Sequence, residues 1–349
     1  MKKYIGLDVH CTSTTFVVMS PTGKRLGKYV VETNGRALVE QLKAIPGELH
    51  VCLEEGTQSA WLYELLSPRV EEVVVALVEQ SRGQKSDEID AHRLAEQLRT
   101  GTLKSKVYKE QGAFGTLREI ARTHRMVVQD VVRVKGRLKS LYRSRGIPSP
   151  GETVYSVQGR ELMLEKLPDA TRAAAELLYR EYDGVEDVRR KAEKDLVTEA
   201  RRHPIYRVLR TCPGLGPIRA AHMMPIVVTP GRFRTKRQFW SYCGLGVVMR
   251  SSSDWVSNGD RWAKANVQLP RGLTVSFNRV LKWVFKGAAM TVITTGGDVP
   301  LRQDYERLLK GGTKPPLARL TLARKIAAIA LSMWKSGKEY DPRKEQKKD

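Results

Sequence analysis

Five acidic side chains in the first hundred residues stand where predicted strands end or a predicted helix begins. Asp8 lies near the end of the apolar stretch YIGLDV, and Glu54 and Glu55 directly follow a second apolar stretch. Asp87 and Asp90 are three residues apart at a predicted helix start, which places them on one helix face. Carboxylates that converge from distant parts of a chain repel one another, and a bound divalent cation relieves that repulsion. The expected cofactor is Mg²⁺, which prefers oxygen ligands and supports phosphodiester chemistry.

The sequence leaves other roles open for these acids. Asp87 can serve as a helix N-terminal acid, which the helix dipole favours. Asp8 is harder to explain without a partner, because burying an unpaired carboxylate in an apolar strand is costly. Strand alternation sends Glu54 and Glu55 to opposite faces of the sheet. One of these two glutamates can therefore face the site, and alternation alone does not choose between them.

The elements that must position these acids form an α/β domain. Three strands joined by short turns are followed by helix, strand, helix, strand and helix, and this order predicts a mixed sheet with helices on its faces. The predicted strands span residues 3–9, 14–19, 25–32, 49–53 and 73–78, and the predicted helices span residues 37–45, 61–66 and 87–98.

The charge of the chain is concentrated outside this first segment. The 349 residues have a formal net charge of +23, but residues 1–100 carry −2 and the remaining 249 residues carry +25. A near-neutral segment with carboxylates and a cationic remainder indicate a division of labour, with chemistry in one part and phosphate binding in the other. A generally basic bacterial surface is the alternative explanation.

Composition also excludes several classes of protein. The four cysteines stand alone with no CxxC pair, which argues against a zinc ribbon, and the length argues against a small disulfide-stapled secreted module. No apolar run reaches about 18 residues, and the N-terminus resembles a strand more than a signal peptide. We therefore expect a cytoplasmic protein that does not contact a membrane.

The middle of the chain is predicted to form a helical coiled-coil arm. Seam positions recur three and four residues apart over more than three heptads, which is typical of a left-handed coiled coil. His124 is the one polar seam position, and we expect it to set the register or to be partly exposed. A second helical stretch, at 171–202, forms with the first either an antiparallel hairpin or a dimerisation arm, and we favour assembly. The seam consists of Leu117, Ile120, His124, Val127, Val131, Val134, Leu138 and Leu141.

The C-terminal part is predicted to be mainly helical and to bind nucleic acid. A helix, a Pro-Gly-x-Gly turn with Gly214 and Gly216, and a second helix with Arg219 resemble a helix-hairpin-helix motif, which grips a nucleic-acid backbone. A glycine-rich helix–helix turn is the alternative. A cluster of cations with aromatic neighbours follows, which suits phosphates and unstacked bases unless the aromatic residues belong to the core. This cluster contains Arg232, Arg234, Lys236 and Arg237, interleaved with Phe233, Phe239 and Trp240.

Three consecutive serines, Ser251, Ser252 and Ser253, lie between Arg250 and Asp254. From the residues alone they predict a flexible loop. Serine has no low pKa and needs an activating neighbour to act as a nucleophile, and no histidine lies nearby in the sequence.

Three blocks of sequence resemble the DEDD transposases of insertion sequences. In that family the second block has the pattern Glu-x-Gly-Thr-x-Ser-x-Trp, which selects Glu54, and the third has Lys-[Ser/Thr]-Asp-x-x-Asp-Ala, which selects Asp87 and Asp90. The resemblance implies an RNase H/RuvC-like fold and a metal-binding tetrad of Asp8, Glu54, Asp87 and Asp90. The blocks here are Ile5-Gly-Leu-Asp-Val-His10, Leu53-Glu-Glu-Gly-Thr-Gln-Ser-Ala-Trp61 and Lys85-Ser-Asp-Glu-Ile-Asp-Ala91.

The segment from Cys212 to Ser253 resembles the second domain of the same transposases, in which a serine attacks DNA and forms a phosphoserine link. Counting from Gly244-Leu places this nucleophile on Ser252. The glycine that the family has after its serine pair is replaced here by Ser253-Asp254, so the choice among the three serines stays open. Arg250, beside them, is expected to contact nucleic acid.

The resemblance further implies an RNA-guided recombinase. In that group a structured non-coding guide RNA, the bridge RNA, pairs with both donor and target DNA, and the protein acts as a homo-tetramer of two dimers. The implied division is a RuvC-like catalytic domain at 1–108, the coiled-coil arm at 109–204, a serine-bearing transposase domain at 205–340 and a charged tail at 341–349. Two rival functions remain: a Holliday-junction resolvase-like nuclease that uses only the carboxylates, and a non-catalytic nucleic-acid-binding protein.

Overall fold

The first of two units in the chain, Met1–Gln111, is built on a six-stranded mixed sheet with the order β3-β2-β1-β4-β5-β6. Strands β1, β2 and β3 form an antiparallel meander, and β4 and β5 run parallel to β1. This is the RNase H/RuvC-like arrangement, so the predicted fold class is confirmed. The strands are β1 (Lys2–Val9), β2 (Ser13–Met19), β3 (Arg25–Glu32), β4 (Glu48–Glu54), β5 (Glu72–Ala76) and β6 (Lys106–Val107).

The computed structural model describes residues 1–77, 86–103, 106–107, 114–249, 255–257, 259–264, 271–295 and 300–343. Strand β6, which pairs antiparallel with β5, is a short addition that the sequence pattern did not predict.

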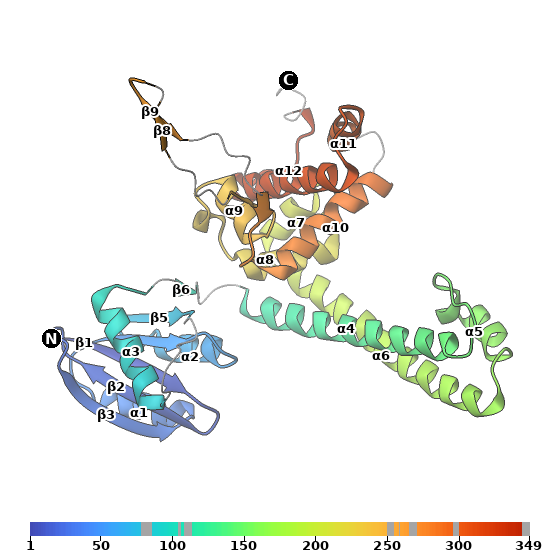
Figure 1. Cartoon of the computed structure of the whole chain (residues 1–349). Coiled ribbons are helices and arrows are strands. Elements are labelled where there is room, and N and C mark those ends of the chain that lie inside the picture. Colours follow the sequence, from blue (N-terminus) through green and yellow to red (C-terminus); the bar gives the residue numbers. More distant parts are fainter. Residues whose placement is uncertain are drawn as a thin grey trace. The chain divides into compact units, whose positions relative to one another are not determined.

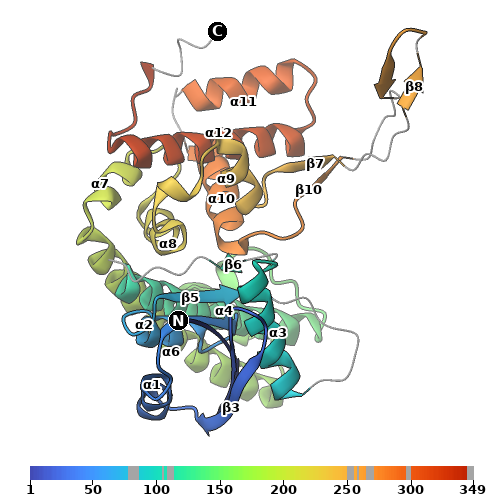
Figure 2. The same ribbon diagram turned by 90° about the vertical axis from the view of Figure 1, so that its left-hand side faces the viewer.

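Helices cover both faces of the sheet, as Figure 2 shows for α1 and α3. The alternation of β1 explains the two layers, because Ile5 and Leu7 point into the core that the sheet forms with α1 and α2. Gly6 points to the other face, toward α3. A Cβ atom on Gly6 would lie 1.8 Å from the carbonyl oxygen of Ala91, so α3 can approach β1 this closely only over a glycine. The helices are α1 (Gly35–Lys43), α2 (Ser59–Leu66) and α3 (Asp87–Thr100).

The second unit, Gly112–Asp349, begins with a helical hairpin. Helices α4 (Gly115–Arg143) and α6 (Asp169–Arg201) pack along each other, and the short α5 (Val157–Leu164) lies between them in the sequence (Figure 1). Leu117 near the start of α4 shares a core cluster with Leu196 near the end of α6. At the other end of α4 the Tyr142 hydroxyl lies 3.0 Å from that of Tyr179. The two helices are therefore antiparallel.

The seam of α4 is buried as predicted, with Leu117, Val131, Val134 and Leu138 all in the core. Its partner within the chain is α6, so the structure shows the antiparallel hairpin, which is one of the two predicted alternatives, and assembly of the arm between chains stays a prediction. The physical reason for this pairing is that α6 has an apolar face of its own. This face includes Ala175 and Leu196 and packs against the seam along the length of α4.

His124 is buried, so the expectation that it is partly exposed is wrong, while the alternative that it sets the register stays a prediction. Its Nδ1 lies 3.1 Å from Nε2 of His222, a second buried histidine in α8 (Pro217–Val227). Burial lowers the pKa of both rings, and that of His222 falls to about 3. Both histidines are therefore neutral near pH 7, and the N–H of one ring donates a hydrogen bond to the ring nitrogen of the other.

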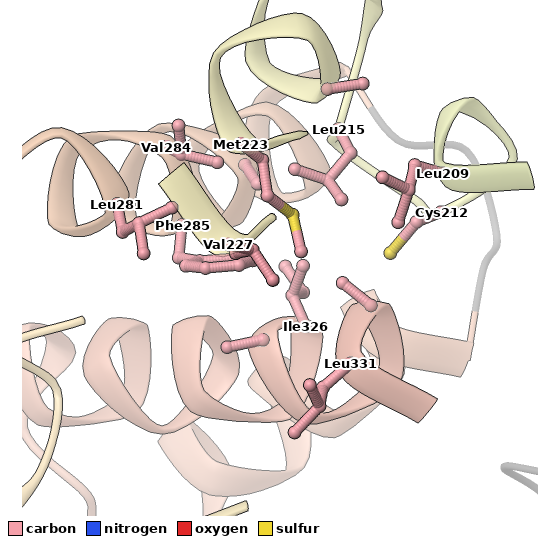
Figure 3. Close-up of a cluster of buried hydrophobic side chains, with 14 of the residues drawn as sticks. Leu209, Cys212, Leu215, Met223, Val227, Leu281, Val284, Phe285, Ile326 and Leu331 are labelled. Carbon is pink, nitrogen blue, oxygen red and sulfur yellow. The ribbon is translucent and has the colours of Figure 1, made fainter. Parts of the chain in front are cut away.

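The rest of the second unit is mainly helical, as predicted, and surrounds one apolar core (Figure 3). Proline begins four of its helices, where the missing amide hydrogen costs nothing. Two short two-stranded ribbons, β7 with β10 and β8 with β9, accompany the helices. The helices are α7 (Pro204–Arg210), α8 (Pro217–Val227), α9 (Lys236–Tyr242), α10 (Arg279–Thr295), α11 (Pro300–Lys310) and α12 (Pro315–Ser336), and the strands are β7 (Val247–Met249), β8 (Trp255–Ser257), β9 (Trp262–Lys264) and β10 (Arg271–Leu273).

Among the described residues, every helix is too short or too polar to span a lipid bilayer.

Candidate functional site

Asp8 and Asp87 meet where β1 ends and α3 begins, and His10 lies between them. The Nε2 atom of His10 is 3.2 Å from Oδ2 of Asp8 and 3.4 Å from Oδ1 of Asp87. One potential ligand atom from each of the three residues lies within 4.8 Å of the other two. Among the described residues, Glu54 and Asp90 are not part of this tight group.

Two local features bring α3 to this position. Gly6 allows the helix backbone to lie directly on β1, two residues before Asp8. The Ser86 hydroxyl accepts a hydrogen bond from the amide of Ile89 and thereby begins the helix at Asp87. The first turn of α3 therefore lies at the end of β1 and carries its acids there.

The three acids in that first turn have different partners. Asp87 faces His10, whereas Glu88 is bound by Arg25 and Lys28 of β3 and so tethers the helix to the sheet. Asp90 forms an ion pair of 3.0 Å with Arg93, one turn further along. Asp87 and Asp90 also interact electrostatically with Asp8, which places both of them near the end of β1.

Strand register separates Glu54 from Glu55. Gly6 of β1 pairs with Cys52 of β4, and Cys52 packs against α3, so this side of both strands faces that helix. Asp8 and Glu54 each lie two residues further along, so both are on the face that α3 covers. Glu55 follows on the opposite side and accepts a hydrogen bond of 3.0 Å from Ser59 of α2. This geometry favours Glu54, as the family pattern does.

The electrostatics around Asp8 are those of crowded carboxylates. Burial raises the pKa of Asp8 above its usual value, and the charges of Asp87 and Asp90 raise it further. His10 acts in the opposite direction and lowers it. A divalent cation between these side chains would reverse the balance, because it favours the ionised form of every carboxylate.

The donor set fits a divalent cation. Two carboxylates and one imidazole converge, and Asp8 is half-buried while Asp87 and His10 are exposed. The carboxylates suit a hard ion, and the imidazole adds a ligand that transition metals accept.

His10 is the site residue that sequence reasoning missed. It stands in the first block, two positions after Asp8, but a lone histidine beside an acidic strand end is a common surface residue. The signal that could have found it is this spacing, because i and i+2 side chains point to the same side of an extended chain.

The predicted phosphate grip folds as a helix, a turn and a helix, formed by α7 and α8. Gly214 has a φ of +78°, and a Cβ there would lie 2.3 Å from the carbonyl oxygen of Ala288 in α10. Gly216 has open space around its Cα. Arg219 donates hydrogen bonds of 2.9 Å to the Gly214 carbonyl and to the Thr291 hydroxyl. The close approach at Gly214 is thus to the protein's own helix, which supports a packing role for this glycine.

In the cation cluster around α9, one arginine bonds to the end of α8 and the other three cations are exposed. Arg232 donates to the carbonyl oxygens of Ile226 and Val227 at the end of α8. The other three cations, Arg234, Lys236 and Arg237, are exposed. The aromatic neighbours are structural, since Phe233 and Phe239 are buried and Trp240 donates a hydrogen bond of 2.8 Å to the Arg324 carbonyl. They are core residues, so base stacking by Phe233 and Phe239 is not available.

The predicted nucleophile Ser252, its neighbours Ser251 and Ser253, and the predicted contact Arg250 lie outside the described residues, as does Lys85 of the third block.

Two family models match the chain. A DEDD-type transposase model of IS110 elements matches residues 5–144, and a model for the transposase IS116/IS110/IS902 family matches residues 206–300. The first range contains the whole acidic group, and the second contains the turn at Gly214 and the three serines. No curated protein matches the chain. Since the two ranges together cover more than half of its residues, the chain belongs to the IS110 family of transposases, enzymes that cut and rejoin DNA.

Proposed function

We propose that this transposase cuts and rejoins DNA at a composite site, with Asp8, Glu54, Asp87 and Asp90 holding Mg²⁺ and Ser252 acting as the nucleophile. The observation that carries the proposal is the convergence of Asp8 and Asp87 on the α3 face of the sheet, where Glu54 also lies. His10 completes the group as a further ligand or as a positioning partner of the two aspartates.

Each residue has a defined task in the proposed reaction. The carboxylates bind the ion, which when present stabilises negative charge on the scissile phosphate. The Ser252 oxygen loses its proton and bonds to phosphorus, and the bond from phosphorus to the leaving deoxyribose oxygen breaks. That oxygen takes up a proton, so the net transfer of one proton is from the serine hydroxyl to the leaving group. Rejoining to a different strand reverses these bonds and releases the serine.

Sequence specificity is proposed to come from a guide RNA that pairs with donor and target DNA. The supporting feature is the net charge of +25 on residues 101–349, which suits a protein that holds several nucleic-acid backbones and delegates base recognition to pairing. A tetramer of two dimers would then bring four acidic sites and four copies of Ser252 to the paired DNAs.

Trapping a covalent adduct on a nicked suicide DNA substrate tests this mechanism. We expect an adduct with the wild-type protein, in the presence of Mg²⁺ and RNA transcribed from the DNA that flanks the gene, and mass spectrometry should map it to Ser252. The Ser252→Ala and Asp8→Ala proteins should form none. Glu54→Gln should lose at least about a hundredfold in rate, because several kcal/mol of charge stabilisation depend on the metal ligands. Glu55→Gln is the matched control and should keep its activity.

Two outcomes would favour the rivals. Cleavage by Ser252→Ala without any adduct identifies a resolvase-like nuclease that activates water, and full function of Asp8→Ala identifies a non-catalytic binding protein. An adduct that persists in Ser252→Ala but disappears in Ser251→Ala or Ser253→Ala would move the nucleophile to that neighbour.

A further inference from the structure

A basic pocket lies where α6 ends and α7 begins, within the second unit. It has a volume of about 610 Å³, which falls in the range of ligand-sized clefts, and it is lined by Arg201, Arg202, His203, Tyr206, Arg207 and Arg210 together with Pro204 and Thr211. Its lining contains four arginines and no carboxylate. A cavity of this charge attracts an anion.

Most of this charge is not neutralised by the protein itself. Arg202 forms an ion pair of 2.8 Å with Glu199. No carboxylate among the described residues pairs with Arg201, Arg207 or Arg210, although all three are exposed. Two cations of the α4–α6 arm differ, because Arg133 pairs with Asp130 and Arg137 pairs with Glu181, each at 2.5 Å.

Tyr206 adds a neutral donor to this cationic wall. Its side chain lines the pocket and is 97 % buried, and its hydroxyl has no hydrogen-bond partner within the described part of the chain. Burial raises the pKa of Tyr206, while the nearby Arg210 and Arg201 act against this effect. The hydroxyl therefore keeps its proton, and a buried donor without a partner is rare unless a ligand or water satisfies it. The Arg210 guanidinium lies over the Tyr206 ring, 5.7 Å from its centre, which fixes the position of both side chains.

We infer that this pocket binds a phosphate of the DNA backbone, with Arg207 and Arg210 as the contacting cations and the Tyr206 hydroxyl as an additional donor. The inference rests on the proposed function, since it assumes that the second unit holds the DNA on which the chain acts. Guanidinium groups suit phosphate because their planar donors match its oxygens. The lining contains no asparagine or glutamine, the side chains that read adenine, and we assign its arginines to the backbone, where they position the DNA and carry no sequence information.

Equilibrium binding of a 30-base-pair duplex DNA to the full chain in EDTA, over a salt series, tests the pocket separately from catalysis. Arg207→Gln/Arg210→Gln should weaken binding at least about tenfold and reduce the slope of log affinity against log salt by about two, because each lost phosphate contact contributes about one. Arg180→Gln/Arg319→Gln removes the same charge from two exposed arginines elsewhere in the second unit. This control should change affinity less than about threefold. Tyr206→Phe should weaken binding with an unchanged salt slope, because it removes a donor and no charge.

A chemical footprint gives a direct second measurement. Phenylglyoxal should modify Arg207 and Arg210 in the free protein, and the duplex should protect both, as mass spectrometry of the digested protein would show.

Three results would overturn the inference. Equal DNA affinity and salt slope in the wild-type and Arg207→Gln/Arg210→Gln proteins would show that the pocket does not contact DNA. The proposed function would remain intact. If the Arg207→Gln/Arg210→Gln protein lost binding to a structured RNA of the same length but kept its DNA affinity, the pocket would be assigned to RNA. Failure of the wild-type chain to bind duplex DNA at any salt would overturn the proposed function and this inference together.

Discussion

The buried histidine pair makes the second unit sensitive to mild acid. The rings of His124 and His222 are joined by one hydrogen bond. The His222 ring also lies edge-on to the Trp283 ring, and the two ring centroids are 5.6 Å apart. One additional proton on either ring would place a charge in a buried apolar layer. Because the pKa of both residues is lowered by burial, the unfolded chain binds protons below about pH 6.5 that the folded chain does not.

The stability of this unit should therefore decrease as the pH falls below about 6.5. His222, with its pKa of about 3, accounts for about 2 kcal/mol between pH 6.5 and 5, at about 1.4 kcal/mol for each pH unit. Urea unfolding followed by tryptophan fluorescence measures this loss. His222→Asn should be less stable at pH 7.5 but should show a much shallower pH dependence. An unchanged pH dependence in that variant would show that other groups are responsible.

At the scale of elements, the acidic site depends on how closely α3 lies on β1. Gly6 and the small residue Ala91 form the contact, and Ala95 packs on the same strand one turn later. The two strands and the helix that carry Asp8, Glu54 and Asp87 are rigid elements, and rigid elements hold ligands more precisely than loops do. A shift of α3 would separate Asp87 from Asp8 without changing any ligand.

Gly6→Ala should consequently damage both stability and the site. The added methyl group would lie 1.8 Å from the Ala91 carbonyl oxygen and 2.7 Å from the Ala95 amide nitrogen, so α3 must move. We expect a loss of about 3 kcal/mol, at the upper end of overpacking effects, together with a lower affinity for divalent metal in calorimetric titration. Gly35→Ala in α1 is the control, because its Cβ would meet Leu65 at an ordinary 3.7 Å. Wild-type metal affinity in Gly6→Ala would contradict this account.

At the scale of the whole molecule, the chain separates its acidic chemistry from its positive charge. The proposed metal-ligating group lies in Met1–Gln111, whereas the pocket that we propose for phosphate lies in Gly112–Asp349. On these proposals, separate units let carboxylates converge without being neutralised by the arginines that would hold DNA. The expected consequence is that metal binding and backbone binding are independent until DNA bridges the two units.

Hydrogen exchange measured with and without Mg²⁺ tests this independence. The ion should increase protection in peptides from β1 and α3 and leave those from α7 and α8 unchanged. At an ion concentration a hundred times the dissociation constant, bound ion should raise the free energy of unfolding of the first unit by about 2.7 kcal/mol. Asp8→Asn should abolish the protection. Equal protection in both units would show that the ion binds elsewhere or that the units respond as one.

The local elements were predictable because their signals are local. The apolar stretch in residues 3–9 and the heptad seam from Leu117 to Leu141 depend on residues that are close in the chain, and both elements form as expected. The family pattern implies Asp8, Glu54, Asp87 and Asp90 from motifs that are each a few residues long, and this tetrad stays a prediction. The turn at Gly214 was predicted, but its contact with Ala288, which supports a packing role, was not.

Contacts between distant segments were decided only by the tertiary structure. The sequence pattern left open whether the seam of α4 pairs with the second helical stretch of the same chain or forms a dimerisation arm, and the structure pairs it with α6. The encounters of His124 with His222, 98 residues away, and of His10 with Asp87 depend on packing that no local pattern encodes. The fold class and the charge split could be derived from the sequence, because they depend on periodicity and composition, and the acidic tetrad is what the resemblance to the DEDD transposases implies. Only the tertiary structure showed that Glu54 lies on the face of the sheet that α3 covers, assembled the arginines of the pocket and buried the histidine pair, because these depend on how elements pack.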